Sequence, residues 1–391
     1  MTAAAAPPRD FPHAEFEQRL ARAQAGMARD GLDALLLTTE PELRWFTGFL
    51  TEFWHSPTRP WFLVVPLAGK PIAVIPAIGA PLMARTWIDD IRSWESPRPD
   101  DEGISLLLAT LREVGADGGR IGLPMGPETV LRMPLTDYAR LRAALPRTEF
   151  ADCTPLLRSL RQVKSEVEIA CIAHACRVAA DAFDALPEIA HAGQPLVETF
   201  RAFRIELLRR GADAVPFLVG AAAPGGYGDV ISPPDRRPLQ AGDVLMLDTG
   251  AQYAGYFCDF DRNFAIGHAD EASRRAHDTL YRATEDGLAA ARPGATCAEL
   301  FHAMQRTIAA DGYPAGNTGR LGHGLGLQLT EWPSHTADDD TVLEPGMVLT
   351  LEPGLAIAPG RTLVHEEDIV IRPHGPELLS RRAPAELPLI G

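Results

Sequence analysis

The first part of the chain alternates between amphipathic stretches and short apolar runs. Residues 14–30 place apolar side chains at helical spacing, and Gly31 follows where a helix would end. Three short runs bounded by Pro, Gly or charged residues are typical of buried strands. They span 33–39, 62–67 and 72–77, and helical patterns cover 80–88 and 103–114. This order predicts a compact α/β domain over residues 1–155.

The pattern changes near Pro155, where one long helical stretch begins and covers 156–186. Further helices are expected near 196–210, 270–290 and 297–311, and strands near 215–220, 243–249, 262–267, 346–351 and 367–372. Long helices among separated strands indicate an α+β fold for this half. Because 391 residues exceed what one hydrophobic core usually supports, we expect two domains, 1–155 and 156–391.

Composition excludes several classes of protein. A hydrophobic fraction of 46% and a charged fraction of 23% are those of an average globular chain. The net charge of −15 argues against nucleic acid or anionic lipid as a partner, since both need clustered cations. No apolar run approaches the length of a membrane span, and the N-terminal residues contain no apolar signal segment. Five cysteines without a CxxC pair fit a reducing cytoplasm.

Candidate chemistry begins in the segment 242–264. An apolar strand ends in Asp248, a Gly-containing turn follows, and a second strand brings in Asp259 and Asp261. Antiparallel strands can place such acids side by side. Buried acids without a partner are costly, so a bound cation would explain them. Considered alone, most pairs of this kind are two separate surface aspartates on a hairpin, so the pair by itself is a weak indication of a metal site.

Three later segments add further ligand types. His323 lies among glycines, Glu352 ends an apolar strand before a Pro-Gly turn, and Glu366 lies in a half-apolar strand. Four carboxylates and one imidazole on one sheet face would suit two divalent ions, chosen from Mn²⁺, Co²⁺, Fe²⁺ and Zn²⁺. Two such ions can lower the pKa of a bridging water toward neutrality and polarise a carbonyl.

Taken together and in this order, these residues resemble the creatinase, prolidase and aminopeptidase P family, which has the pita-bread fold. The segment 40–49 is similar to a strand-turn segment of the family, and 157–175 to its linker helix, with Lys164, Ser165 and Glu168 in a Lys-Ser-x-x-Glu pattern. The resemblance implies a creatinase-like N-terminal domain, a pita-bread catalytic domain and a homodimer. It assigns the metal ligands Asp248, Asp259, His323, Glu352 and Glu366, with Glu366 preferred over Glu367.

The chain departs from the peptidase members of this family at three positions. They carry a His near the position of Ile231 and another at Thr330, and they carry Thr at Asp261. The missing histidines normally hold the substrate carbonyl. Other polar and aromatic residues near these motifs are therefore candidates for substrate binding, together with Thr330 itself: Tyr227, Asp229, Trp332, His335 and His365.

A second group of candidates lies in the aromatic stretch 49–62 of the N-terminal domain. Core or interface packing would explain these aromatics. In family dimers, however, this domain overhangs the partner's site. Trp54, Trp61 and Trp332 would then hold an onium group by cation–π attraction, and His55 and Arg59 lie beside them. Arg59 would alternatively pair with a substrate carboxylate.

We therefore expect a dinuclear metallohydrolase that cleaves an amide or related C–N bond in a small zwitterionic or dipeptide-like substrate. Metal-bound hydroxide would attack, and Glu352 would shuttle the proton. One alternative is a non-peptidase relative: a hydrolase of small C–N compounds, or a metal-dependent lyase of a small onium carboxylate such as dimethylsulfoniopropionate. In the lyase, Asp261 or Asp229 would abstract a proton. A third possibility is a binding protein that keeps the fold without catalysis.

Overall fold

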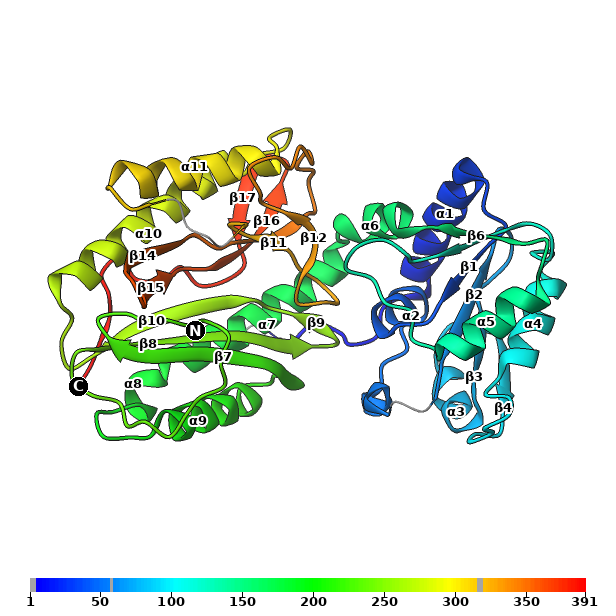
Figure 1. Cartoon of the computed structure of the whole chain (residues 1–391), viewed down its shortest axis with the longest axis horizontal. Coiled ribbons are helices and arrows are strands. Elements are labelled where there is room, and N and C mark those ends of the chain that lie inside the picture. Colours follow the sequence, from blue (N-terminus) through cyan, green and yellow to red (C-terminus); the bar gives the residue numbers. More distant parts are fainter. Residues whose placement is uncertain (1–4, 57–58, 315–318) are drawn as a thin grey trace. The chain divides into compact units, whose positions relative to one another are not determined.

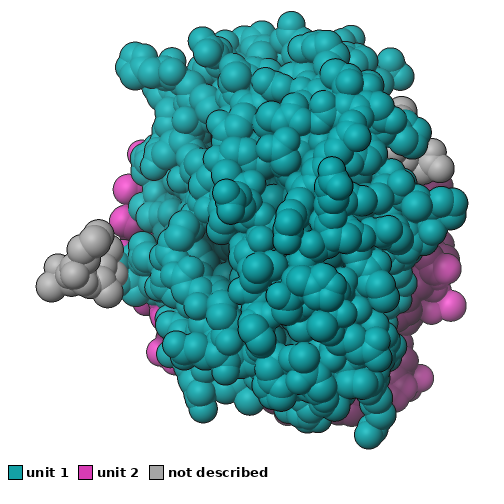
Figure 2. Space-filling model, turned by 90° about the vertical axis from the view of Figure 1, so that its left-hand side faces the viewer, with its two compact units in different colours: residues 1–7, 162–391 teal, residues 8–161 magenta. Residues whose placement is uncertain are grey.

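The protein is described by a computed structural model that covers residues 5–56, 59–314 and 319–391. These residues form two compact units, drawn as ribbons in Figure 1 and distinguished by colour in Figure 2. The N-terminal unit comprises Pro8–Arg161. The C-terminal unit comprises the described residues of 162–391 together with residues 5–7. Among the residues covered, no helix has the length and apolarity needed to span a membrane.

The N-terminal unit contains a six-stranded mixed sheet with the order β4-β3-β2-β1-β5-β6. The central pairs β1–β2 and β2–β3 are antiparallel, and the remaining pairs are parallel. The strands are β1 (Ala34–Leu37), β2 (Phe62–Pro66), β3 (Ile72–Pro76), β4 (Asp90–Trp94), β5 (Arg120–Leu123) and β6 (Glu149–Asp152). The helices are α1 (His13–Asp30), α2 (Glu40–Thr47), η1 (Glu52–His55), η2 (Ala77–Gly79), α3 (Ala80–Met83), α4 (Ile104–Glu113), α5 (Leu135–Ala144) and α6 (Thr154–Gln162).

The predicted α/β character of this unit is confirmed. Strands β1, β2 and β3 are buried along their whole length, as their apolar runs require. Helix α1 ends where expected, with Gly31 in the left-handed region at φ 67°. The helix expected over 80–88 is only the short α3. The following residues form β4, whose half-exposed, polar sequence DIRSW has no apolar run to reveal an edge strand.

The C-terminal unit contains two sheets and a two-stranded ribbon. One sheet has the order β18-β10-β8-β7 with β9 paired to β8, and the other has the order β12-β11-β13-β16-β17. The first sheet contains β7 (Ala214–Pro224), β8 (Asp243–Tyr253), β9 (Tyr256–Phe257), β10 (Phe260–Ile266) and β18 (Leu389–Ile390). The second contains β11 (His323–Gly324), β12 (Glu331–Ser334), β13 (Val348–Leu351), β16 (Glu367–Arg372) and β17 (Gly375–Leu378). The ribbon pairs β14 (Gly354–Ala358) with β15 (Arg361–Val364).

Helices cover the outer faces of this unit, and the two sheets lie between them (Figure 1). Helices α7 and α9 pack against β8 and β7, whereas α10 packs against β13, β14 and β15. The helices are α7 (Glu166–Asp184), α8 (Leu186–Ile189), α9 (Leu196–Arg209), α10 (Glu271–Ala290) and α11 (Cys297–Ala310). This layered arrangement is the pita-bread architecture expected from the sequence.

The prediction of a single helix over 156–186 is wrong, because these residues form two helices, α6 and α7. Val163 forms a bridge to Met347, and the amide of Lys164 donates to the carbonyl of Gly346 at 2.9 Å. The helix restarts at Ser165, whose amide donates to Glu168 Oε2 at 3.0 Å. Tertiary pairing with the loop before β13 therefore outweighs the helical periodicity of these residues.

Candidate metal centre

The predicted hairpin of acids is formed by β8 and β10. These strands pair antiparallel, with Asp248 directly opposite Asp261. Asp259 lies one residue before β10 begins, on the same side as Asp261 by strand alternation. Asp248 is half-buried, and Asp259 and Asp261 are 4% and 2% exposed. The hairpin thus delivers three aspartates into the space between the two sheets.

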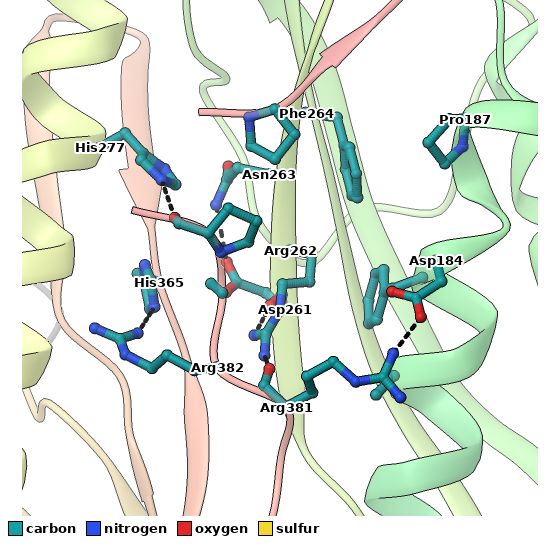
Figure 3. Close-up of a pocket in the computed structure, with 15 residues that line it drawn as sticks. Asp184, Pro187, Asp261, Arg262, Asn263, Phe264, His277, His365, Arg381 and Arg382 are labelled. Carbon is teal, nitrogen blue, oxygen red and sulfur yellow. Dashed lines mark hydrogen bonds and ion pairs between the residues drawn. The ribbon is translucent and has the colours of Figure 1, made fainter. Parts of the chain in front are cut away.

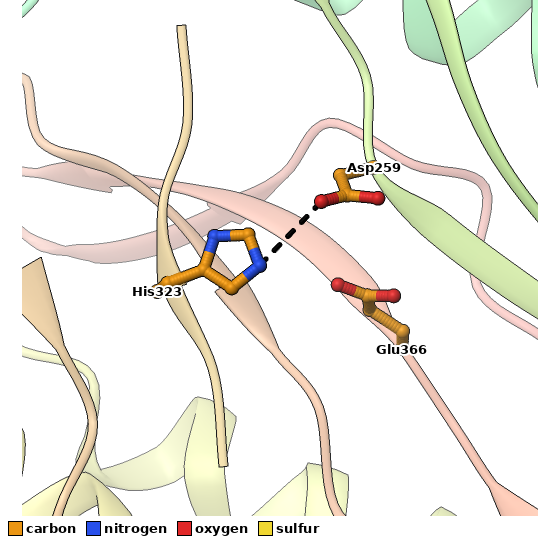
Figure 4. Close-up of side chains that lie close together, drawn as sticks. All are labelled: Asp259, His323 and Glu366. Carbon is orange, nitrogen blue, oxygen red and sulfur yellow. Dashed lines mark ion pairs between the residues drawn. The ribbon is translucent and has the colours of Figure 1, made fainter. Parts of the chain in front are cut away.

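The second sheet supplies the other candidate ligands. His323 begins β11, Glu352 follows β13, and Glu366 precedes β16. Asp259, His323 and Glu366 each offer one ligand atom, and these atoms lie within 4.8 Å of one another (Figure 4). His323 Nε2 is 3.5 Å from Asp259 Oδ2 and 3.9 Å from Glu352 Oε2. The structure therefore brings together these four residues from segments far apart in the sequence.

Backbone hydrogen bonds hold His323 and Glu352 in place. The amide of His323 donates to Thr350 Oγ1 at 3.1 Å, and the amide of Glu352 donates to the carbonyl of Leu321 at 3.0 Å. His323 Nδ1 lies 2.9 Å from the carbonyl of Gly324, so Nε2 is the nitrogen that faces the acids. Gly322 has φ 137°, and a Cβ there would lie 2.3 Å from the carbonyl oxygen of Thr350. Only glycine fits this approach.

Two further acids support the candidate ligands from behind. Asp261 Oδ1 accepts the amide N–H of Glu366 at 2.7 Å, and Asp368 Oδ2 accepts the amide N–H of Asp259 at 2.9 Å. Each acid thus holds the backbone of a ligand that belongs to the other sheet. Sequence reasoning missed Asp368, although it follows Glu366 at the two-residue spacing that places side chains on one face of a strand.

Burial and mutual repulsion shift the pKa values of these carboxylates away from their usual range. Burial, followed by the neighbouring carboxylates, raises the pKa of Asp248, Asp259 and Glu366 well above the usual range. Burial also raises the pKa of Glu352. Burial lowers the pKa of His323 to about 3, which keeps its imidazole neutral. A divalent cation binds neutral imidazole and deprotonated carboxylates, and its charge would offset the repulsion among these carboxylates.

Unsatisfied oxygen atoms test the fit of a cation directly. Asp248 Oδ1, Glu352 Oε2 and Glu366 Oε1 are buried and have no hydrogen-bond partner. Buried carboxylate oxygens without partners cost free energy unless a cation is bound. The donor set of carboxylates with one imidazole therefore fits the divalent ions expected from the sequence.

Glu367, the alternative to Glu366 as a metal ligand, forms ion pairs with two arginines. Its carboxylate lies 2.8 Å from Arg262 Nη2 and 3.0 Å from Arg382 Nη1. Burial alone would raise the pKa of Glu367, but Arg262 and His365 hold it below the ordinary value. A carboxylate already neutralised by two guanidinium groups has less need of a cation, which supports the preference for Glu366.

The substrate-binding candidates of the C-terminal unit occupy different surroundings. Tyr227 is fully buried, with its hydroxyl donating to Asn263 Oδ1 at 3.0 Å. His335 is also buried, with Nε2 lying 3.1 Å from the carbonyl of Thr350. Asp229 is exposed and accepts hydrogen bonds from Ser232. Thr330 and Trp332 are half-buried on either side of Glu331 in the segment of β12.

The candidates of the N-terminal unit form an aromatic cluster around η1. Trp61 is 1% exposed and packs against Phe49, Phe53 and Trp54. The guanidinium of Arg59 lies over the ring of Phe53. His55 is exposed and lies 3.6 Å from Glu52. Residues 57 and 58 of the predicted stretch 49–62 lie outside the described residues.

His365 and Asp261 also line a separate cavity of about 260 Å³ beside β10 and the C-terminal segment (Figure 3). Its charged groups are paired with one another. Arg381 binds Asp181 and Asp184, and His365 Nε2 lies 2.7 Å from Arg382 Nη1. Because these cations are neutralised within the protein, we assign no ligand to this cavity.

Comparison with known proteins connects this geometry to a family. Residues 170–373 match the model of Metallopeptidase family M24, and residues 19–163 match the Creatinase/Prolidase N-terminal domain. A probable dipeptidase PepE of Mycobacterium tuberculosis is 30% identical over 379 residues, covering 93% of each chain. An Xaa-Pro dipeptidase of Pyrococcus horikoshii is 32% identical over 238 residues, which cover 60% of this chain and 66% of the relative.

Solved structures agree with the sequence comparisons. The crystal structure of dipeptidase PepE from Mycobacterium ulcerans has a TM-score of 0.84 and 26% identity, covering 97% of this chain and 99% of that one. A prolidase from Thermococcus sibiricus gives a TM-score of 0.85 at 22% identity, which supports the fold. The chain therefore belongs to Metallopeptidase family M24, with a creatinase/prolidase-type N-terminal domain, and is a metal-dependent, prolidase-like hydrolase.

Proposed function

We propose that this enzyme is a dinuclear dipeptidase. In this proposal the ligands of two divalent cations, Mn²⁺, Co²⁺, Fe²⁺ or Zn²⁺, are Asp248, Asp259, His323, Glu352 and Glu366. The substrate is a dipeptide or a similarly small zwitterion that is cleaved at its amide bond. The supporting observation is the convergence of Asp259, His323 and Glu366, with Glu352 Oε2 3.9 Å from His323 Nε2, together with three buried carboxylate oxygens that have no hydrogen-bond partner.

The protein's own residues prepare the site for this reaction. When bound, two divalent cations polarise a carbonyl and lower the pKa of a nearby water. Glu352 is the candidate for proton transfer, since its side chain keeps 35% of its surface exposed and its Oε2 has no partner. Burial raises the pKa of Glu352 above its ordinary value, and proton transfer by a carboxylate is most efficient when its pKa lies close to the operating pH. We propose that Glu352 Oε2 takes a proton from water and passes it to the leaving nitrogen.

The names of the sequence relatives support the proposed dipeptide substrate. The two sequence relatives described above are named as a probable dipeptidase and an Xaa-Pro dipeptidase. The missing histidines are the one observation that favours a non-peptidase reaction, because the chain has no His between His191 and His268 and carries Thr at 330. Incorporation of ¹⁸O from labelled water into the product separates hydrolysis from a lyase reaction.

The decisive experiment combines metal content with a substrate screen. The full-length protein is stripped, reconstituted with each of the four metals and assayed on Xaa-Pro and other dipeptides beside small betaines and cyclic amidines. We expect two ions per chain and dipeptide cleavage. Asp248→Asn serves as a matched variant that removes one ligand charge, and we expect it to hold fewer ions. Cleavage of a betaine without cleavage of any dipeptide contradicts the proposed activity, and a metal-free active protein contradicts the centre.

Three further parts of the proposal concern the catalytic domain, the oligomeric state and the cellular location. We propose 156–391 as the catalytic domain and a homodimer as the active form, which light scattering on the purified protein tests. All five cysteines are buried free thiols, which supports our proposal of a reducing cytoplasm.

A further inference from the structure

A cation that the sequence analysis did not single out lies at the edge of the candidate centre. Arg320 is half-buried and stands three residues before His323, whereas the next residue, Leu321, is 1% exposed. Leu321 is fixed on both sides, since its amide donates to the carbonyl of His335 at 2.9 Å and its carbonyl accepts the amide of Glu352 at 3.0 Å. The backbone of Arg320 is thus held one residue from a direct contact with the proposed proton carrier.

The guanidinium group of Arg320 is not neutralised within the described part of the protein. There it forms no ion pair, and its one hydrogen bond runs from Nη2 to Thr330 Oγ1 at 3.4 Å. By contrast, Arg262 and Arg382 in the same unit are both paired with Glu367. A half-exposed guanidinium bound only to a hydroxyl keeps most of its five N–H donors available.

The charge of Arg320 reaches the metal centre. Burial raises the pKa of Asp259 and of Glu352, and the Arg320 cation opposes this rise in both. Burial lowers the pKa of His323, and Arg320 lowers it further. Thr330 directly precedes Glu331, which pairs with Gly324 next to His323, so the hydrogen bond to Thr330 holds the guanidinium of Arg320 beside the segment that carries His323.

The guanidinium of Arg320 would be available to bind an anion once divalent cations occupy the centre. Two divalent cations would neutralise the four carboxylates of the candidate ligand set, so these carboxylates would not need Arg320 as a partner in the loaded centre. A guanidinium is always charged and matches a carboxylate through two parallel hydrogen bonds. The hydroxyl of Thr330 can donate a further hydrogen bond to the same anion while it accepts from Arg320.

We propose that Arg320, held by Thr330, binds the free carboxylate of the substrate and makes the enzyme selective for dipeptides over their C-terminal amides. This inference rests on the proposed function, and it names the group by which that site recognises its substrate. Arg320 is then a specificity-determining residue that touches the substrate at a point distinct from the bond that is cleaved.

Kinetics on a matched substrate pair tests this role. The metal-loaded enzyme is assayed on Ala-Pro and on Ala-Pro amide as wild type, Arg320→Lys and Arg320→Met. We expect Arg320→Met to lower kcat/KM for the acid by about 10- to 100-fold, mainly through KM, as for a lost hydrogen bond to a charged group. The kcat/KM for the amide should fall much less than that for the acid, so the acid-to-amide ratio is the measure of recognition, and Arg320→Lys should recover part of this ratio. Arg306→Met, on the exposed face of α11, is the charge-matched control.

Metal binding by calorimetry separates recognition from a structural role. Removing a cation beside the ligands should leave Mn²⁺ affinity unchanged or tighter, whereas a distorted His323 loop would weaken it. Binding of both peptides to metal-loaded Glu352→Gln reports recognition without turnover. Equal binding of acid and amide, or weaker Mn²⁺ binding by Arg320→Met, overturns the inference. Absence of dipeptide cleavage by the wild type, with acid-selective binding retained, overturns only the proposed reaction.

Discussion

Replacing Asp261 tests whether this acid supports the metal centre or takes part in proton transfer. Its Oδ1 accepts the amide N–H of Glu366 at 2.7 Å, and the side chain is 2% exposed. Asp261→Ala removes this acceptor and leaves the amide of a candidate ligand without its partner. Asp261→Asn keeps an oxygen in the same position but removes the charge.

The structure sets the size of the expected effects. A hydrogen bond to a charged acceptor contributes about 1.5–3 kcal/mol, and a bond between neutral groups about 0.5–1.5 kcal/mol. Residues that orient a metal ligand typically change metal affinity by about 10- to 100-fold. We therefore expect Asp261→Ala to weaken Mn²⁺ binding within this range and Asp261→Asn to weaken it by less. Burial raises the pKa of Asp261 to about 7, so Asn also removes a repelling charge that the metal-free protein must accommodate.

Calorimetric titration of the stripped protein with Mn²⁺, beside the midpoint of metal-free thermal unfolding, measures both effects. Weaker metal binding by the Ala variant, with partial recovery in the Asn variant, is the pattern of a supporting acceptor. Mn²⁺ binding by Asp261→Ala at wild-type affinity refutes this reasoning. Loss of turnover in Asp261→Asn at normal metal affinity would instead assign it the proton transfer of the lyase hypothesis.

Three further predictions follow from the same geometry. In the metal-free protein burial raises the pKa of Asp261 and Asp368 to about 7, so these two groups bind more protons in the folded state, and their contribution to the free energy of unfolding falls as pH rises from about 4 to about 7. Urea titrations in EDTA at pH 5 and pH 8 on the wild type and Asp368→Asn isolate the contribution of Asp368, and an equal change with pH in both proteins contradicts it. Glu352→Gln should lower kcat by about 10²- to 10⁴-fold while metal remains bound; elemental analysis is the control, and near-normal turnover excludes Glu352 as the proton carrier. Thr296→Ala removes the acceptor for the amide of Glu299 at the start of α11 and should cost about 1 kcal/mol in urea unfolding, whereas Thr296→Ser should keep the wild-type value; equal stability of Ala and Ser variants contradicts the cap.

Much of the fold followed from apolar patterns, and the failures have physical causes. Strands such as β8 and β13 are continuous buried runs, so their positions were predictable. The edge strand β4 is partly exposed and has no apolar run, so period and apolarity alone did not reveal it. The break between α6 and α7 depends on the contact of Lys164 with Gly346, which lies 182 positions away and has no local signal.

The candidate site shows the same division. The five proposed ligands stood out because their residue types recur in order at strand ends, beside turns that the sequence marks with Pro and Gly. Arg320 was missed because a single arginine in a glycine-rich loop resembles any surface cation. The hydrogen bond from the amide of Glu352 to the carbonyl of Leu321, the residue after Arg320, connects the two segments only in the folded chain.

The two sheets of the C-terminal unit share the proposed ligands between them. Asp248 and Asp259 lie in or directly beside strands of one sheet, and His323, Glu352 and Glu366 lie in or directly beside strands of the other. Neither sheet alone supplies all the proposed ligands, so bound ions would link the two sheets and stabilise their packing. Metal uptake should then coincide with the last step of folding, and metal loading should slow hydrogen exchange in both sheets at once.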